Sequence, residues 1–117
     1  MNVLGYLEGS EYPDEVLVIT GHYDHIGVKR DGTVNNGAND DASGTSAVLE
    51  IAEAFASATM AGHRPKRSIL FMTVSGEEKG LLGSEFYAEN PILPLENTIA
   101  NLNIDMIGRY APERGFE

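Results

Sequence analysis

The sequence predicts an α/β domain in which helices flank a mixed, mostly parallel central sheet as a three-layer sandwich. The first observation is the order of the elements, because short apolar runs alternate with helical patterns, as in parallel strands joined by helices. The second is that 42 % of the 117 residues are hydrophobic, which is enough for one core. We therefore expect residues 1–117 to belong to a single domain.

Four short apolar runs, bounded by turn residues, are the strand candidates. Residues 3–7 (VLGYL) come before the first helical pattern and are expected to form an antiparallel edge strand. Residues 16–19 (VLVI) and 69–74 (ILFMTV) are nearly continuous apolar runs, typical of strands buried on both faces. Residues 99–104 (IANLNI) form the third strand of the predicted parallel core, also expected to be buried.

Two segments have the pattern of helices. Val48 and Phe55 lie on one apolar stripe of a helix predicted over residues 42–60, whose start Asp41 or Ser43 could cap. A second helix is predicted over residues 80–89, because the following Asn-Pro pair halts it. Between the first two parallel strands, residues 21–41 are rich in Gly, Asn and Asp and predict a long loop or a small hairpin.

The composition limits the classes of partner. Eighteen acidic and eight basic side chains give a net charge of −10, which disfavours nucleic acids and anionic membranes, although acidic surfaces also simply favour solubility. The chain has no cysteine, so a transition metal would have to bind His, Asp or Glu. No run has the length of a membrane span, and nothing resembles a signal peptide, so the compartment stays undetermined.

Polar residues that can bind metals follow the three predicted parallel strands. They are His22 and Asp24, then Glu77 and Glu78, then Asp105. Open α/β sheets bind their ligands at the carboxyl ends of the strands, so we expect these side chains to meet at one edge. Apolar residues flank Asp105, so its ionised carboxylate is expected to need a partner.

The long loop adds Asp40 and Asp41 immediately before the first helix. One imidazole and several carboxylates could then converge, a donor set that suits zinc, manganese or cobalt. A purely structural explanation stays open for each of these segments. Residues 22–25 could be a polar turn, Asp40 and Asp41 could cap the first helix, and Glu77 and Glu78 could form the first turn of a helix.

Four segments together resemble a known family in order and spacing: "GHYDHIG", "NNGANDDASGTSAVLEIAEAF", "KRSILFMTVSGEEKGLLGSEFYAENP" and "NIDMIGR". They are similar to the di-zinc aminopeptidase family of clan MH, a superfamily that also holds glutamate carboxypeptidase and glutaminyl cyclase. The initial "NVLGYLEGS" resembles the strand before the first metal ligand. The resemblance implies a truncated phosphorylase/hydrolase-like zinc peptidase fold.

The resemblance also implies a role for each site residue. Asp40 would bridge two zinc ions, His22 and Asp105 would complete one site, and Glu78 would bind the other ion. Glu77 would be the general base.

Two further features are implied by the resemblance. Asp24 would fix the tautomer and orientation of the His22 imidazole, and a non-proline cis peptide bond is expected between Asp40 and Asp41. Family members take the second zinc's His from a segment beyond "NIDMIGR", and His25 and His63 match no ligand position. Residues 1–117 would thus be a partial catalytic domain, with two zinc ions in the full-length enzyme and one or none here.

The implied function is a zinc-dependent aminopeptidase that uses a metal-activated water to remove N-terminal residues from peptides, with this chain alone expected to be inactive. The acidic site would suit a free α-amino group, but carboxypeptidase specificity stays open. Two alternatives are glutaminyl cyclase-type acyl transfer and a non-catalytic binding or assembly module that keeps the peptidase sheet. An exposed sheet edge or apolar face would favour self-association. Relatives are mostly secreted or periplasmic.

Overall fold

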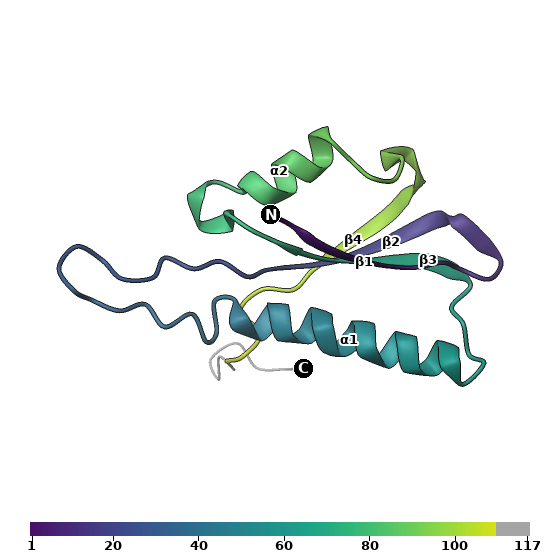
Figure 1. The fold of residues 1–117 in the computed structure, drawn as a ribbon, viewed down its shortest axis with the longest axis horizontal. Helices are drawn as coiled ribbons and strands as arrows, with labels where there is room; N and C mark the ends of the chain where they lie inside the picture. The colour runs from purple at the N-terminus through teal and green to yellow at the C-terminus, as the bar shows by residue number, and fades with distance from the viewer. Residues whose placement is uncertain (110–117) are drawn as a thin grey trace, which may run out of the picture.

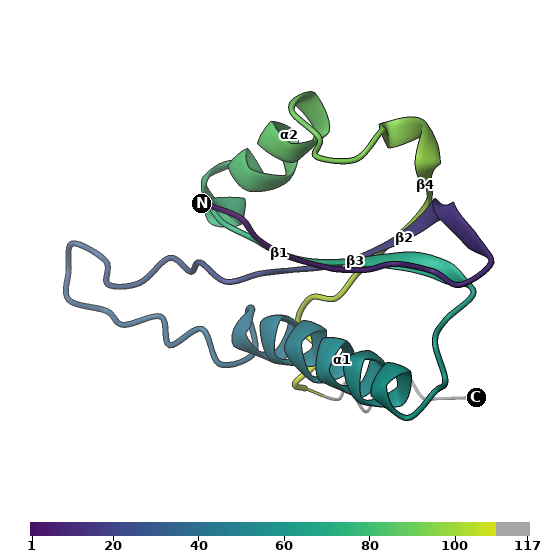
Figure 2. The same cartoon turned by 45° about the vertical axis from the view of Figure 1, so that its right-hand side comes forward.

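The protein folds as three layers, with one helix on each face of a four-stranded sheet (Figure 1). The computed structural model describes residues 1–109. The strands are β1 (Val3–Leu7), β2 (Tyr12–His22), β3 (Arg67–Val74) and β4 (Thr98–Asn103), and the helices are α1 (Ala42–Met60) and α2 (Leu82–Glu89). Viewed from a second direction, α1 and α2 still lie on opposite sides of the sheet (Figure 2). The predicted three-layer α/β fold is confirmed.

The strand order in the sheet is β1-β3-β2-β4. β2 is central and parallel to both of its neighbours, whereas β1 is antiparallel to β3. This is the predicted parallel core with an N-terminal antiparallel edge strand. The carboxyl ends of the three parallel strands therefore meet at one end of the sheet.

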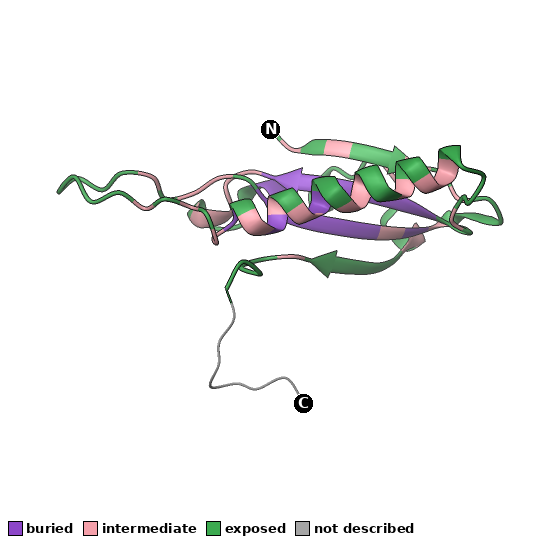
Figure 3. Cartoon of the chain, turned by 90° about the horizontal axis from the view of Figure 1, so that it is seen from below, coloured by how far each residue is buried: buried purple, intermediate pink, exposed green. Residues whose placement is uncertain are grey.

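The core consists of two apolar clusters, one on each face of the sheet. The cluster on the α2 side consists of Val16, Val18, Leu70, Met72, Val74 and Tyr87, and the cluster on the α1 side of Ile19, Val48, Ile69 and Phe71. Successive residues of β3 alternate between the two clusters, which is the period of a strand buried on both faces. Figure 3 shows β2 and β3 as the buried centre, as predicted for these two runs.

The start of α2 differs from the prediction. The sequence pattern placed the helix start at Gly80, but Glu77–Lys79 form a 3₁₀ turn and α2 begins at Leu82. Gly80 and Leu81 both have left-handed backbones, with φ of 101° and 62°. This break separates the turn from the helix. By contrast, the observed bounds of α1 match the predicted range of 42–60.

The predicted burial of the last strand is wrong. Among the described residues β4 is an edge strand that pairs only with β2, and Ile99 and Leu102 are 50 % and 53 % exposed. Burial of a strand depends on what packs beside it, which an apolar run does not encode. Within the described residues, no helix is long and apolar enough to cross a lipid bilayer.

Two glycines allow α1 to lie directly against the carboxyl end of the parallel strands. A Cβ on Gly21 of β2 would lie 3.1 Å from the carbonyl carbon of Gly44 in the first turn of α1. A Cβ on Gly44 would in turn overlap the main-chain oxygen of Ile104 and the carboxylate of Asp41. This close approach brings the residues that precede α1 next to the end of β2.

We expect Gly44→Ala to lower the free energy of unfolding by about 1–3 kcal/mol, because the added methyl group overlaps backbone atoms that cannot move independently. This loss is expected even though alanine is the better helix former. Urea denaturation followed by circular dichroism measures it. Gly5→Ala is the matched control, since its Cβ would meet nothing within 4 Å. Equal stability of the two variants would contradict the close approach.

Candidate metal centre

Four segments meet where the parallel strands end. His22 is the last residue of β2, Glu77 and Glu78 begin the 3₁₀ turn after β3, and Asp105 follows β4 by two residues. Asp40 precedes α1, whose first turn packs on the same end of the sheet. The structure thus brings together all the residues that the sequence proposed as ligands.

The first group of candidate ligands is centred on His22, which is buried. Its Nε2 lies 3.1 Å from Asp40 Oδ1 and 3.9 Å from Asp105 Oδ1. Donor atoms of His22, Asp41 and Asp105 all lie within 4.8 Å of one another. The Nε2 atom is buried and has no hydrogen-bond partner among the described residues. A buried, unpaired imidazole nitrogen that faces carboxylates is what a metal site requires.

The two adjacent aspartates have different surroundings. Asp41 is 1 % exposed, and its carboxylate accepts hydrogen bonds from the backbone N–H groups of His22 (3.1 Å), Gly44 (2.8 Å) and Met106 (3.3 Å). It caps α1, as the structural explanation predicted. The Asp40 side chain is 35 % exposed and faces His22, so Asp40 is the better ligand of the two. The peptide bond between them is cis, which confirms the expectation.

A second group of donors lies beside the first and consists of His25, Asp40 and Glu78, all within 4.8 Å of one another. The distance from His25 Nδ1 to Glu78 Oε1 is 3.0 Å. Both atoms are buried, and neither has an aligned hydrogen bond within the described part of the chain. The family resemblance assigned no ligand position to His25, which follows His22 by three residues.

Asp24 connects the imidazole to the 3₁₀ turn. His22 Nδ1 lies 3.0 Å from the main-chain oxygen of Asp24 and 3.7 Å from its carboxylate. A proton on Nδ1 is thereby held by the carbonyl, which leaves the Nε2 lone pair free for a metal. The Asp24 carboxylate accepts hydrogen bonds from the N–H groups of Glu77 (3.0 Å) and Glu78 (3.3 Å). Burial favours a higher pKa for Asp24, but these hydrogen bonds outweigh it and lower the pKa.

The clustered carboxylates affect each other and His22. Burial raises the pKa of Asp105, and the negative charge of Asp41 raises it further. Burial lowers the pKa of His22, but the Asp24 carbonyl and the carboxylates of Asp41, Glu77 and Asp105 raise it by more. Neighbouring carboxylates contribute to both shifts, and a bound cation would offset their negative charge. Imidazole and carboxylate donors without thiolates fit zinc.

The Asp105 side chain is 38 % exposed and faces His22, the kind of partner that the sequence predicted it to need. It lines a cavity of about 350 Å³ together with His22 and Glu77, and Met72 and Leu81 form part of the apolar wall. Glu77 Oε2 lies 3.9 Å from His22 Nε2 and belongs to neither donor group. Its carboxylate is therefore beside the candidate metal site and open to a ligand in the cavity.

A parallel α/β sheet with two adjoining groups of imidazole and carboxylate donors at its carboxyl end defines a metallohydrolase-like site. Comparison with known families identifies the class. The model of peptidase family M28 matches residues 2–117, so the chain belongs to this family. The predicted resemblance is confirmed.

Curated relatives agree with the family. The chain is 42 % identical to a "Probable zinc metalloprotease" of Pyrenophora tritici-repentis, over 97 % of this chain and 23 % of the relative. It is 38 % identical to a "Probable glutamate carboxypeptidase" of Arthroderma benhamiae, over 90 % of this chain and 14 % of the relative. The chain spans about a quarter or less of the length of these relatives.

Two solved structures have the same fold. One is BSAP, a zinc aminopeptidase from Bacillus subtilis, with a TM-score of 0.73 and 32 % identity over 92 % of this chain and 24 % of that chain. The other is an aminopeptidase from Aneurinibacillus sp. strain AM-1, with a TM-score of 0.68 and 28 % identity over 92 % of this chain and 24 % of that chain. The family assignment and the zinc named for the Pyrenophora and Bacillus proteins match the prediction, whereas the role of each residue stays a prediction.

We expect Asp41→Asn to lower the free energy of unfolding by about 2–3 kcal/mol, because an amide in this position turns an N–H group toward backbone donors. Urea denaturation in EDTA measures the loss without a contribution from metal binding. Glu53→Gln on the exposed side of α1 is the matched control and should change stability by less than about 0.5 kcal/mol. A stable Asp41→Asn variant would show that the three hydrogen bonds are dispensable.

Proposed function

We propose that the protein carrying this sequence is a zinc-dependent aminopeptidase. The observation that carries the proposal is the meeting of His22, Asp40, Glu78 and Asp105 from four separate segments, with Glu77 beside them. Membership of family M28 and the likeness to two aminopeptidase structures support it.

Each side chain has a distinct task in this proposal. His22, Asp40 and Asp105 hold one zinc ion, while Asp40 and Glu78 face the second. When bound, the ions polarise the peptide carbonyl and lower the pKa of a water molecule. Asp24 keeps the imidazole of His22 in the tautomer that presents Nε2.

Glu77 is the proposed general base. Its carboxylate lines the same cavity as His22 and Asp105, so a substrate carbonyl and a water molecule placed there would lie next to it. Glu77 takes a proton from the water and returns it to the leaving amine. The Glu77 backbone is fixed because its N–H group donates to Asp24.

The proposed substrate is a peptide with a free N-terminus. An ammonium group suits a site rich in carboxylates, in a chain with a net charge of −10. One relative is named a "Probable glutamate carboxypeptidase", so specificity has to be measured. Three assays separate the candidates: release of an N-terminal residue, release of a C-terminal residue, and cyclisation of an N-terminal glutamine.

We expect Glu77→Gln to reduce kcat for a leucine arylamide by at least about 100-fold, because general acid-base catalysis contributes that much or more. The assay uses the whole protein that carries this sequence, since the chain spans about a quarter of its relatives. Zinc content should stay unchanged, because Glu77 is in neither donor group.

Glu85→Gln in the exposed part of α2 is the control and should retain activity. Unchanged turnover in Glu77→Gln would remove Glu77 from its role. Cyclisation without hydrolysis would favour the acyl-transfer alternative. Zinc binding with none of the three activities would favour a binding or assembly module.

We also propose that the 117-residue chain self-associates through β4. The strand has the sequence TIANLN, with no charged residue to block pairing, and its Ile99 and Leu102 are exposed. A second copy can pair along this edge and cover both side chains.

Light scattering at micromolar concentration should then give a mass above that of one chain. We expect Leu102→Lys to restore the monomer, because a charge on an edge strand opposes pairing. Met60→Lys, at an exposed position of α1, is the control and should not change the mass. A monomeric unmodified chain would contradict the proposal.

A further inference from the structure

Asn2 is a polar side chain to which the proposed function gives no task. It precedes β1 and is half-buried. Its Oδ1 accepts a hydrogen bond from the backbone N–H of Ser75 (3.3 Å), and its Nδ2 donates to the main-chain oxygen of Gly83 (2.7 Å). Ser75 follows β3, and Gly83 lies in the first turn of α2. One side chain therefore joins the two ends of the segment that carries Glu77 and Glu78.

The segment between these two ends, residues 76–82, is folded back on itself. The backbone N–H of Leu82 donates to the oxygen of Gly76 over 3.1 Å. The two ends are also in close contact, because a Cβ on Gly83 would overlap the main-chain oxygen of Ser75. The segment is therefore a closed loop, and the place of the side chains that it carries depends on what holds the loop.

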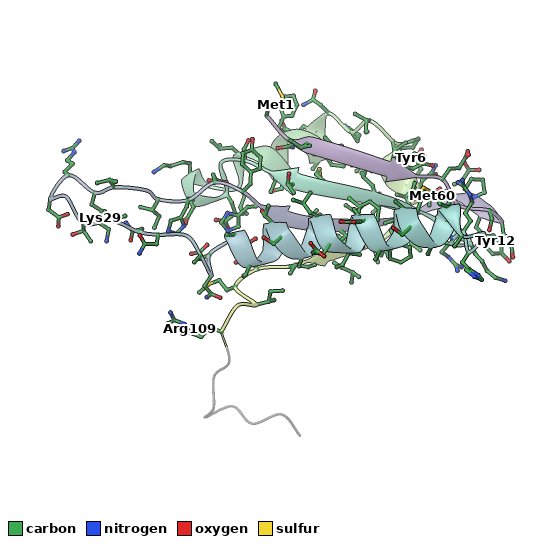
Figure 4. The ribbon with its side chains drawn as sticks, turned by 60° about the horizontal axis from the view of Figure 1, so that its bottom comes forward. Met1, Tyr6, Tyr12, Lys29, Met60 and Arg109 are labelled. Carbon is green, nitrogen blue, oxygen red and sulfur yellow. The ribbon has the colours of Figure 1, made fainter. Side chains whose placement is uncertain are left out.

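The edge strand β1 brings Asn2 to this 76–82 loop. β1 is antiparallel to β3, and Val3 lies opposite Thr73, so the start of β1 lies beside the end of β3. Figure 4 shows Met1 at this end of β1 and Tyr6 toward the other end. A strand at the edge of the sheet thereby contacts the loop that carries two side chains of the candidate metal centre.

Asn2 and Asp24 hold the loop from opposite sides. Asp24, which follows β2, accepts the backbone N–H groups of Glu77 and Glu78. Asn2 joins the two ends of the loop from the β1 side. Because β3 lies between β1 and β2, the loop that follows it is fixed on both sides. A catalytic group has to stay within about 0.5 Å of its productive position, so a loop held on one side only is expected to place Glu77 less accurately.

We propose that Asn2 is a positioning residue that holds the Glu77 carboxylate where it acts as the general base. The inference rests on the role that the proposed function gives to Glu77. Asn2 acts through the backbone of the loop, since its two hydrogen bonds go to Ser75 and Gly83. Its removal leaves the hydrogen bonds of Asp24 in place, so the loop stays near the site but is free to shift.

A purely stabilising role for Asn2 is the alternative, and the two roles predict different kinetics. If Asn2 only stabilises the fold, its loss lowers the rate by the same factor whichever side chain is at position 77. If Asn2 positions the base, its loss lowers the rate only while Glu77 is present. Residues that act as a unit in catalysis show this non-additivity, and a double-mutant cycle measures it.

The experiment is such a cycle in the whole protein that carries this sequence, with saturating Zn²⁺ and a leucine arylamide as substrate. We expect Asn2→Ala to lower kcat by at least about 10-fold and to leave KM unchanged, since a misplacement of about 1 Å can cost 100-fold. In the Glu77→Gln background the same substitution should lower kcat by less than about twofold. Asn2→Asp keeps the shape and the acceptor but lacks the donor to Gly83, so it should behave in the same way.

Asn90→Ala is the matched control. Asn90 is exposed, and its side chain donates to the main-chain oxygen of Phe86 near the other end of α2, so this variant loses the same kind of hydrogen bond away from the loop. It should retain kcat in both backgrounds. Circular dichroism and zinc content check the fold and the metal of each variant.

The outcomes separate the inference from the proposed function. A loss of kcat only in the presence of Glu77, with unchanged zinc content, supports the inference. An equal loss in both backgrounds, no loss in Asn2→Ala, or a loss of bound zinc overturns the inference and leaves the proposed role of Glu77 intact. An undiminished kcat in Glu77→Gln contradicts the proposed function itself, and the single variant shows this before Asn2 is changed. If Asn2→Ala does not fold, Asn2→Asp decides between the same outcomes.

Discussion

The carboxylate of Asp41 is the group on which the geometry of the site depends. It is buried and accepts backbone hydrogen bonds from the end of β2, the first turn of α1 and the segment after β4. Burial of a carboxylate is costly unless hydrogen bonds compensate for the lost water, and here three N–H groups do so. Two of these N–H groups belong to, or lie beside, a proposed ligand, because His22 donates directly and Met106 follows Asp105, while the third belongs to Gly44 in the first turn of α1. One residue outside the proposed ligand set thereby holds together the segments that carry the proposed ligands.

Asp24 has the corresponding role for the remaining segment. Its backbone oxygen holds Nδ1 of His22, and its carboxylate holds the backbone N–H groups of Glu77 and Glu78. Asp41 and Asp24 together connect the ends of all three parallel strands to the start of α1. The side chains that face the cavity can then stay free of hydrogen bonds within the protein, as metal ligands and a general base require.

The sequence predicted the local elements well because their patterns are local. Nearly continuous apolar runs located β3 and the centre of β2, which extends over Tyr12–His22, and the 3.6-residue period located α1 within its observed bounds. Chain order then gave the parallel core and the antiparallel edge. The exposure of β4 and the start of α2 were missed, since the first depends on neighbours in space and the second on a left-handed backbone at Leu81, which a non-glycine residue rarely adopts.

The candidate metal centre was also predictable from the sequence only in part. Residues directly after strands were found because the ends of parallel strands meet, whereas the division of roles between Asp40 and Asp41 was left open by the residues alone. Adjacent residues in a loop can point in different directions, and only the backbone decides which one turns into the protein. The placement of His25 beside Glu78 is a related case, since it depends on contact with Gly37, twelve residues away in the sequence.

The electrostatics of the metal-free site link metal binding to folding. Asp105 has a raised pKa because burial and the neighbouring Asp41 both oppose its ionised form, and the carboxylates around His22 favour the protonated imidazole. A cation reverses both effects, since it stabilises ionised carboxylates and requires a neutral imidazole. Metal binding therefore removes a repulsion that the folded chain otherwise carries, and it does so at the point where the four segments meet. A ligand that binds only this arrangement stabilises the whole fold by the free energy of its binding. The residues that give the site its chemistry thus also make the stability of the sheet end depend on the metal.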